Sequence, residues 1–177
     1  MKTAVVYWSG TGNTEAMAGS VAEGAKSAGA EVSVFTAADF SADMVDQFDS
    51  IAFGCPSMGS EQLEDSEFEP MFNACEAKLS GKKVGLFGSY GWGDGEWMRN
   101  WEEQCIADGA VMAGAKALSA TKLPMTQLPS SALLSVRHLH HKFRIQLKDK
   151  QTYSVKHRRG NALRCSLFPL DNPSPLC

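Results

Sequence analysis

The sequence lacks the long apolar runs of a membrane protein or a secreted precursor. No stretch of its 177 residues approaches the roughly 20 consecutive apolar residues that a transmembrane helix needs. The apolar segment at the amino terminus is short and leads directly into a glycine-rich loop, which is not the pattern of a secretory signal peptide. We therefore expect a cytoplasmic protein with no membrane partner.

Cysteine pairs at metal-ligand spacing are also missing. The five cysteines are an odd number without a CxxC pair, and the four histidines show no spacing typical of a metal site. This pattern favours free thiols in a reducing compartment over a disulfide scaffold. We predict no metal site.

Acidic side chains nearly disappear from the last third of the chain. Residues 1–121 carry 18 acidic and seven basic side chains, a formal charge of −11, whereas residues 122–177 carry two acidic and ten basic ones, a charge of +8. A break this sharp indicates two segments of different character. We predict a domain at residues 1–120 and an irregular basic tail at 121–177.

The first segment alternates short apolar stretches with amphipathic ones. This pattern predicts an α/β fold, a doubly wound five-stranded parallel sheet with helices on both faces. Glycine-rich loops follow the first, third and fourth expected strands, and these loops converge only if the strand order is 2-1-3-4-5. The expected strands are 5–7, 31–35, 51–54, 82–87 and 111–118, and the expected helices are 14–27, 41–48, 64–79 and 95–107.

The loop after the first expected strand combines glycines with hydroxyl and amide side chains. It lacks the Gly-Lys-Ser/Thr ending of a nucleoside-triphosphate loop and the third glycine of the dinucleotide fingerprint. It also lacks lysine and arginine, so a phosphate here would be held by neutral donors and the first amides of the following helix. The alternative is a plain turn with an Asn or Thr N-cap. The loop residues are Ser9, Gly10, Thr11, Gly12, Asn13 and Thr14.

Two further loops offer flat or adaptable apolar side chains. Tyr90 and Trp92 stand among glycines at 88–94 and are candidates for stacking on a planar ligand, although packing against the next helix is the alternative. Met58, after the third expected strand, can lie against a ring or fill a gap. A phosphate loop beside two such loops indicates a phosphorylated planar molecule without an adenylate, and FMN fits well.

Three stretches resemble the short-chain flavodoxins of anaerobic bacteria: YWSGTGNTE (7–15), MGSEQLEDSEFEP (58–70) and GKKVGLFGSYGWGDGEWM (81–98). The resemblance covers residues 1 to about 120. It implies a flavodoxin-like fold and a low-potential one-electron carrier with non-covalently bound FMN, rather than an enzyme with catalytic residues. It also implies a monomer that docks transiently with reductases and ferredoxin-linked oxidoreductases.

The resemblance assigns the FMN contacts to the three loops. Residues 9–14 match the family's phosphate loop, and the loop after the third strand lies beside the flavin's inner face and its N3/N5 edge. Glu61 is then the acceptor for flavin N3–H, with a solvated loop carboxylate as the alternative, and Trp92 stacks on the other face. The implied contacts in the second and third loops are Pro56, Ser57, Met58, Gly59, Ser60, Glu61, Ser89, Tyr90, Gly91 and Trp92.

The resemblance ends after Ala120, where the family continues with an acidic Asn-Glu-x-Pro-Asp segment and a last helix. A nucleotide sequence that encodes residues 121–128 can be written so that the reading frame one nucleotide earlier encodes Asn-Glu-Ala-Pro-Asp-Asp-Ala-Ala. Our hypothesis is a single-nucleotide loss near codon 120 that leaves an out-of-frame tail.

Two other functions remain open on the sequence. An FMN-dependent reductase would take hydride from NAD(P)H, which needs a second pocket over the flavin that Trp92 should block. A basic tail binding nucleic acid or a membrane surface would use Lys156, His157, Arg158 and Arg159 as phosphate contacts, but it lacks periodicity and aromatic interleaving. We expect no nucleic-acid partner.

Overall fold

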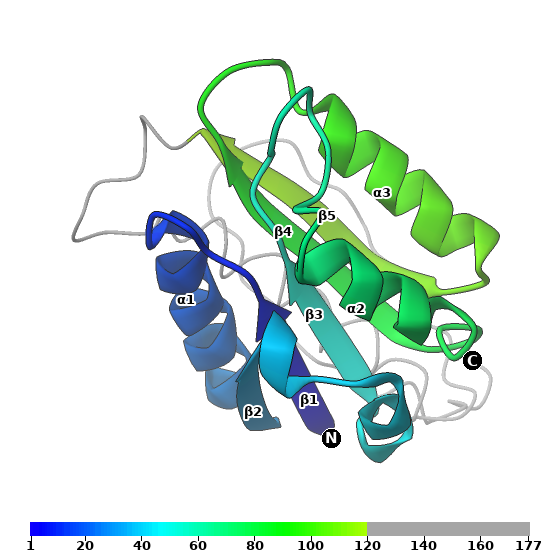
Figure 1. Cartoon of the computed structure of the whole chain (residues 1–177). Coiled ribbons are helices and arrows are strands. Elements are labelled where there is room, and N and C mark those ends of the chain that lie inside the picture. The colour runs from blue at the N-terminus through cyan, green and yellow to red at the C-terminus, as the bar shows by residue number, and fades with distance from the viewer. Residues whose placement is uncertain (120–177) are drawn as a thin grey trace, which may run out of the picture. The chain divides into compact units, whose positions relative to one another are not determined.

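A five-stranded parallel sheet organises residues 1–119, the part of the chain that the computed structural model describes (Figure 1). The strand order is β2-β1-β3-β4-β5, and each neighbouring pair runs parallel. The predicted fold class and strand order are confirmed. The strands are β1 (Lys2–Tyr7), β2 (Glu31–Thr36), β3 (Ser50–Gly54), β4 (Lys83–Tyr90) and β5 (Val111–Ser119).

Helices cover both faces of this sheet. Side chains along β1 alternate between the faces, with Val5 in one buried cluster and Ala4 and Val6 in the other. The Val5 cluster includes side chains of α1, and the other includes side chains of α2 and α3 (Figure 1). The helical segments are α1 (Asn13–Ser27), η1 (Ala37–Asp39), η2 (Ala42–Gln47), α2 (Phe68–Glu76) and α3 (Glu96–Ala107), of which η1 and η2 are 3₁₀.

One face of α1 carries an apolar stripe. Met17, Val21 and Ala25 recur every four residues and are buried. They pack in one cluster with Val5 of β1 and Phe87 of β4. This packing holds the start of α1 beside the carboxyl ends of the central strands.

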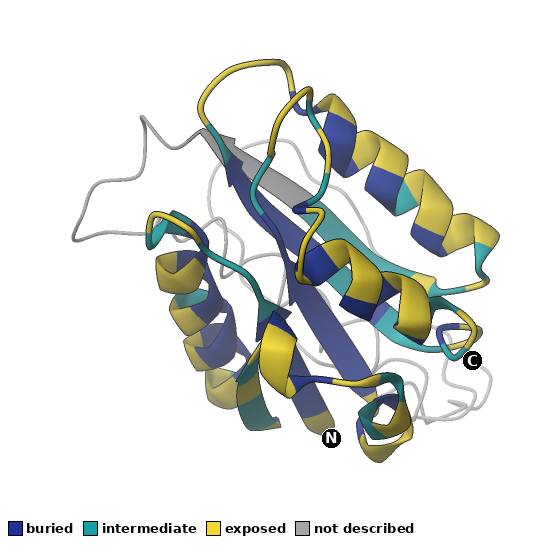
Figure 2. Cartoon of the chain, in the orientation of Figure 1, coloured by how far each residue is buried: buried dark blue, intermediate teal, exposed yellow. Residues whose placement is uncertain are grey.

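Aromatic rings fill the opposite face. The rings of Phe53 in β3 and Phe72 in α2 pack edge to face, with centroids 5.2 Å apart. The Trp101 ring of α3 packs edge to face on Phe68 and Phe72, with centroid distances of 5.4 and 5.5 Å. Each such pair stabilises the fold by about 1 kcal/mol beyond the contribution of its buried apolar area. The central strands are therefore buried, while the loops at their ends are largely exposed (Figure 2).

Two predicted helices differ from the structure. The helix expected at 64–79 is the shorter α2, because the chain before it forms a turn around the carboxylate of Glu64, which accepts the amides of Glu67 and Phe68. The helix expected at 41–48 is the 3₁₀ segment η2. Ser41 is its N-cap residue but makes no side-chain cap hydrogen bond.

Strand β4 extends further than predicted, and β5 is irregular. Ser89 and Tyr90 belong to β4 rather than to the loop after it. The register between β4 and β5 shifts between Val84 and Gly85, opposite Gly114 with φ +146°. This bulge makes the start of β5 irregular.

The cysteines in residues 1–119 are free, as predicted. Cys55, Cys75 and Cys105 are buried. Burial raises the pKa of the Cys55 and Cys105 thiols to about 12 and that of Cys75 to about 11, so all three stay protonated at neutral pH. The predicted tail at 121–177 lies outside the described residues.

Candidate cofactor site

The three predicted binding loops meet at the carboxyl ends of β1, β3 and β4. We call them the β1 loop (residues 9–14), the β3 loop (56–61) and the β4 loop (91–95). The amide of Trp8 donates to the carbonyl of Gly54 at 2.9 Å, and the amide of Ser57 donates to the carbonyl of Ser89 at 2.9 Å. These bonds continue the sheet beyond its strands and bring the loops together, as the strand order predicted.

The β1 loop is shaped by its glycines. Gly12 has φ +85°, a left-handed conformation that favours glycine, and its amide donates to the hydroxyl of Ser9 at 3.1 Å. At Gly10 an added Cβ would lie 2.9 Å from the Trp8 ring, so the indole packs directly against the loop backbone. The loop therefore curls closely around the start of α1.

The start of α1 is the feature of this loop that fits a phosphate. Its N-cap residue is Gly12, and within residues 1–119 no side chain caps this end of the helix. The alternative of an Asn or Thr N-cap is therefore wrong. A helix end with unpaired amides attracts an anion, and the hydroxyl of Thr11 and the amide of Asn13 lie beside it, 3.3 Å apart. These donors fit the phosphate of FMN.

Thr14 joins the β1 loop to β4. It is buried, and its hydroxyl lies 3.4 Å from the hydroxyl of Ser89, which is buried too. Two predicted site residues 75 positions apart are thus brought into contact. The direct contact of either side chain with the cofactor stays a prediction.

Of the three side chains predicted to contact a planar ligand, two are exposed and one is packed. Trp92 is 64% exposed and Met58 is 38% exposed, both large values for apolar side chains. Tyr90 instead packs against Trp97 of α3, with ring centroids 5.6 Å apart, and lies partly in the core. Trp92 and Met58 therefore offer apolar surface to a planar ligand. Tyr90 instead packs against α3 and helps to fix the start of the β4 loop.

The β3 loop is closed by a small antiparallel bridge. Met58 and Gln62 exchange both backbone hydrogen bonds at 2.9 Å. Between them Gly59 has φ +48° and Glu61 φ +55°, and Glu61 is the one non-glycine residue with positive φ in the described part of the chain. A left-handed residue with a side chain costs about 1 kcal/mol, so other contacts must hold this turn.

Those contacts come from the carboxylate of Glu61. Its Oε1 accepts the amide of Gly95 at 2.8 Å and the amide of Glu96 at 3.0 Å, at the start of α3. The alternative of a freely solvated loop carboxylate is therefore wrong. Acceptance of flavin N3–H by the same side chain stays a prediction.

Negative charge gathers around this contact. The carboxylates of Glu61, Asp94 and Glu96 lie within 4.8 Å of one another. Arg99 of α3 donates to the Asp94 carboxylate at 2.8 Å and to its carbonyl at 3.1 Å. Sequence reasoning missed this cation, for which the spacing of Asp94 and Arg99 across the start of a helix was the available signal.

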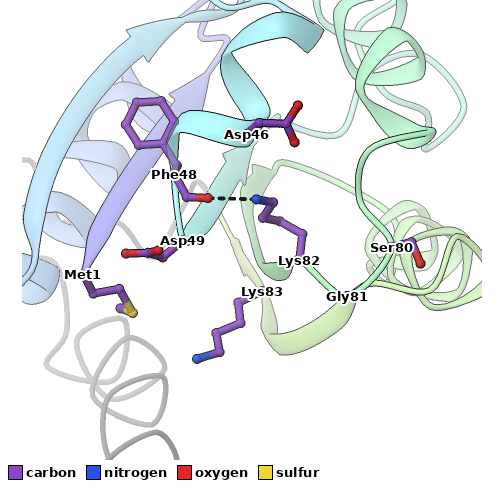
Figure 3. A pocket seen from close by; sticks show the side chains of 8 residues that line it. All are labelled: Met1, Asp46, Phe48, Asp49, Ser80, Gly81, Lys82 and Lys83. Atoms are coloured by element: carbon purple, nitrogen blue, oxygen red, sulfur yellow. Dashed lines mark hydrogen bonds between the residues drawn. The ribbon is translucent and has the colours of Figure 1, made fainter.

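A hollow of about 590 Å³ lies elsewhere on the described part of the chain (Figure 3). It is lined by residues at the amino ends of β1, β3 and β4, including Met1, Asp49 and Lys83. Lys82 at its edge donates to the carbonyl of Phe48 at 2.9 Å. These strand ends are opposite to those that carry the three loops, so the hollow is separate from the candidate cofactor site.

Comparisons with known proteins agree with this geometry. A family model described as flavodoxin matches residues 5–137. The chain is 54% identical to a flavodoxin of Megasphaera elsdenii over 110 residues, which is 62% of this chain and 80% of the relative. It is 50% identical to a flavodoxin of Clostridium beijerinckii over 108 residues, 61% of this chain and 78% of the relative.

A solved structure shows the same fold. The solution structure of two-electron reduced Megasphaera elsdenii flavodoxin superposes with a TM-score of 0.69 at 45% identity, covering 77% of this chain and 98% of that one. None of the helices in residues 1–119 is long and apolar enough to cross a membrane.

Proposed function

Since this chain belongs to the flavodoxin family, whose members carry electrons on FMN, we propose that its three convergent loops hold FMN as a low-potential one-electron cofactor. The chain is an electron-transfer protein rather than an enzyme. The observation that carries the site assignment is the start of α1, which no side chain of residues 1–119 caps, together with the exposed Trp92 and Met58. Bound FMN supplies the redox chemistry, and the protein binds, orients and shields it.

The β1 loop holds the phosphate end of the cofactor. Two helices of the described chain receive a carboxylate on their first amides, α2 from Glu64 and α3 from Glu61, and α1 receives none. Since the domain carries a formal charge of −11 and the loop has no cation, the phosphate depends on hydrogen bonds and the helix dipole for its binding. Ser9, Thr11 and Asn13 add neutral donors.

The β3 and β4 loops hold the flavin ring between Met58 and Trp92. Stacking on these side chains orients the ring and excludes water from its faces. The carboxylates of Glu61, Asp94 and Glu96 surround this end of the site with negative charge. Negative charge disfavours adding electrons to the ring, which supports a low potential.

The family supports docking with redox proteins. We propose reductases and ferredoxin-linked oxidoreductases as transient partners of a cytoplasmic monomer. The relatives reported above are flavodoxins, so neither the NAD(P)H reductase nor a nucleic-acid-binding module is favoured.

FMN should bind about 100-fold more tightly than riboflavin, which lacks the phosphate. This ratio corresponds to about 2.7 kcal/mol, within reach of a few charge-assisted hydrogen bonds at a helix end. Titration of the cofactor-free protein with each flavin, followed by quenching of flavin fluorescence, measures both dissociation constants. Equal affinities would refute the role given to residues 9–14.

Trp92→Ala should weaken FMN binding about tenfold, because one stacking wall is lost. Stacking contributes about 1 kcal/mol to the binding free energy beyond the contribution of the buried apolar area. Trp92→Phe keeps a ring at the same position and should lose less affinity. If the dissociation constants of all three proteins agree, Trp92 does not contact the flavin.

We further propose that residues 1–120 form the FMN-binding domain and that 121–177 are an out-of-frame tail. The two curated relatives align with 110 and 108 residues of this chain, which supports a break, although the family model extends to residue 137. Val111, the first residue of β5, is 53% exposed, so this end of the strand is not covered within the described structure. The nucleotide sequence around codon 120 tests the hypothesis directly.

Restoring the reading frame should raise the unfolding midpoint by about 5 °C, because a last helix would bury apolar surface on the sheet. FMN affinity should change much less, since its loops follow β1, β3 and β4. Thermal unfolding of the two forms checks this. Strong hydrogen-exchange protection of 121–177 in the present chain would identify the tail as a genuine structural element.

A further inference from the structure

We propose that Glu61 is a positioning residue that fastens the β3 loop to the β4 loop through the first amides of α3, before any cofactor binds. The inference rests on the proposed function only in taking these two loops as the walls of the flavin site. It assigns Glu61 a task in the cofactor-free protein that a contact with flavin N3–H cannot perform.

The hydrogen bonds are the first support. Oε1 of Glu61 accepts two adjacent amides, those of Gly95 and Glu96, across 34 and 35 positions of sequence. The N-cap residue of α3 is Gly95, which has no side chain with which to cap the helix itself. A carboxylate at this end satisfies two amides and faces the positive end of the helix dipole.

The backbone of Glu61 is the second support. Its φ of +55° is unfavourable for a residue with a side chain, yet the turn is held by the paired amides and carbonyls of Met58 and Gln62. Such strain persists only where surrounding contacts determine the conformation. Here the strained turn places the Glu61 carboxylate within hydrogen-bonding distance of the first amides of α3.

Gly93 is the third and independent support. A Cβ added there would lie 2.5 Å from Cδ of Glu61 and 2.7 Å from its Oε1. The β4 loop thus passes so close to the carboxylate that only glycine leaves room, and its φ of +86° also favours glycine. The β4 loop is therefore shaped around the carboxylate as well as bonded to it.

Neighbouring carboxylates oppose the position of the Glu61 carboxylate. Glu96 and Asp94 lie close enough to repel the Glu61 carboxylate, and the bond from Arg99 to Asp94 offsets only part of this charge. The two amides must therefore outweigh the repulsion in order to keep it in place. By holding its position, Glu61 fixes the spacing between Met58 on the β3 loop and Trp92 on the β4 loop.

Amide hydrogen exchange of the cofactor-free protein tests the proposal. In Glu61→Ala the amides of Gly95 and Glu96 should exchange at least about tenfold faster than in the parent, because both lose their acceptor. Glu96→Gln is the matched control. It lowers the charge of the same carboxylate cluster but leaves the Glu61 contacts, so these two amides should keep their parent rates.

A second variant covers the case in which Glu61→Ala does not fold. Glu61→Gln keeps an acceptor oxygen but loses the charge, and should accelerate the two amides several-fold, because hydrogen bonds to a charged acceptor are about twice as strong. Parent-like exchange of Gly95 and Glu96 in the folded Glu61 variants would overturn the proposal. Since no flavin is present, this readout is independent of whether the parent prefers FMN to riboflavin.

Flavin binding adds a second readout. Loosening the ring walls should weaken FMN and riboflavin by the same factor, since the phosphate end is unchanged. A loss confined to FMN would place the effect of Glu61 at the β1 loop and contradict its positioning role.

Discussion

Gly88→Ala should lower the free energy of unfolding by about 3 kcal/mol, although it adds a single methyl group. An added Cβ would lie 2.0 Å from the carbonyl oxygen of Cys55 and 3.1 Å from the Trp97 ring. The carbonyl belongs to the backbone next to β4, where the amide of Cys55 donates to Phe87 at 3.1 Å, so it cannot move without breaking the sheet. Overpacking against a fixed neighbour typically costs 1–3 kcal/mol or more.

Urea unfolding of the cofactor-free protein measures this effect, with Gly19→Ala as the control. Gly19 is exposed within α1, and nothing lies within 4 Å of an added Cβ, so alanine there should stabilise the helix by about 0.5–1 kcal/mol. Gly88→Ala should also weaken FMN binding, since the β3 and β4 loops start beside this contact. An unfolding midpoint equal to that of the parent would show that the strands move apart freely.

The fold could be predicted because its determinants are periodic or local. The stripe of Met17, Val21 and Ala25 marks one face of a helix, and glycine-rich loops mark the ends of strands. The strand order followed from a functional requirement, since loops after the first, third and fourth strands meet only in one arrangement. These features need no knowledge of distant contacts.

The parts that could not be predicted depend on side chains whose partners lie far away in sequence. Tyr90 and Trp92 look alike among their glycines, and only the position of Trp97 decides that Tyr90 is the packed one. The contact of Glu61 with Gly95 crosses 34 residues and has no local pattern. The cofactor loops were therefore predictable as loops, but the bonds that fix their spacing were not.

Glu64 is a buried carboxylate that forms a turn before α2, although the helical periodicity predicted it as the first residue of that helix. It is 4% exposed, and its oxygens accept the amides of Ser66, Glu67 and Phe68 at 2.9–3.0 Å as well as the hydroxyl of Ser66. Burial raises the pKa of this carboxyl, but the hydrogen bonds from Ser66, Phe68 and Glu67 outweigh burial and leave the pKa below its ordinary value. The charged form is thus the one that the fold stabilises.

Glu64→Ala should therefore lower the free energy of unfolding by about 3 kcal/mol at neutral pH, because three amides at the start of α2 lose their acceptor. A lowered pKa contributes stability above the ordinary glutamate pKa of about 4.3 and loses it as pH falls through the lowered value. The difference between parent and variant should hence shrink in acid. Glu69→Ala, an exposed change in the first turn of α2, should stay within about 0.5 kcal/mol of the parent at every pH. Urea unfolding of the three proteins between neutral pH and about pH 3 tests this, and a difference that stays constant over the range would mean that the Glu64 charge does not stabilise the turn.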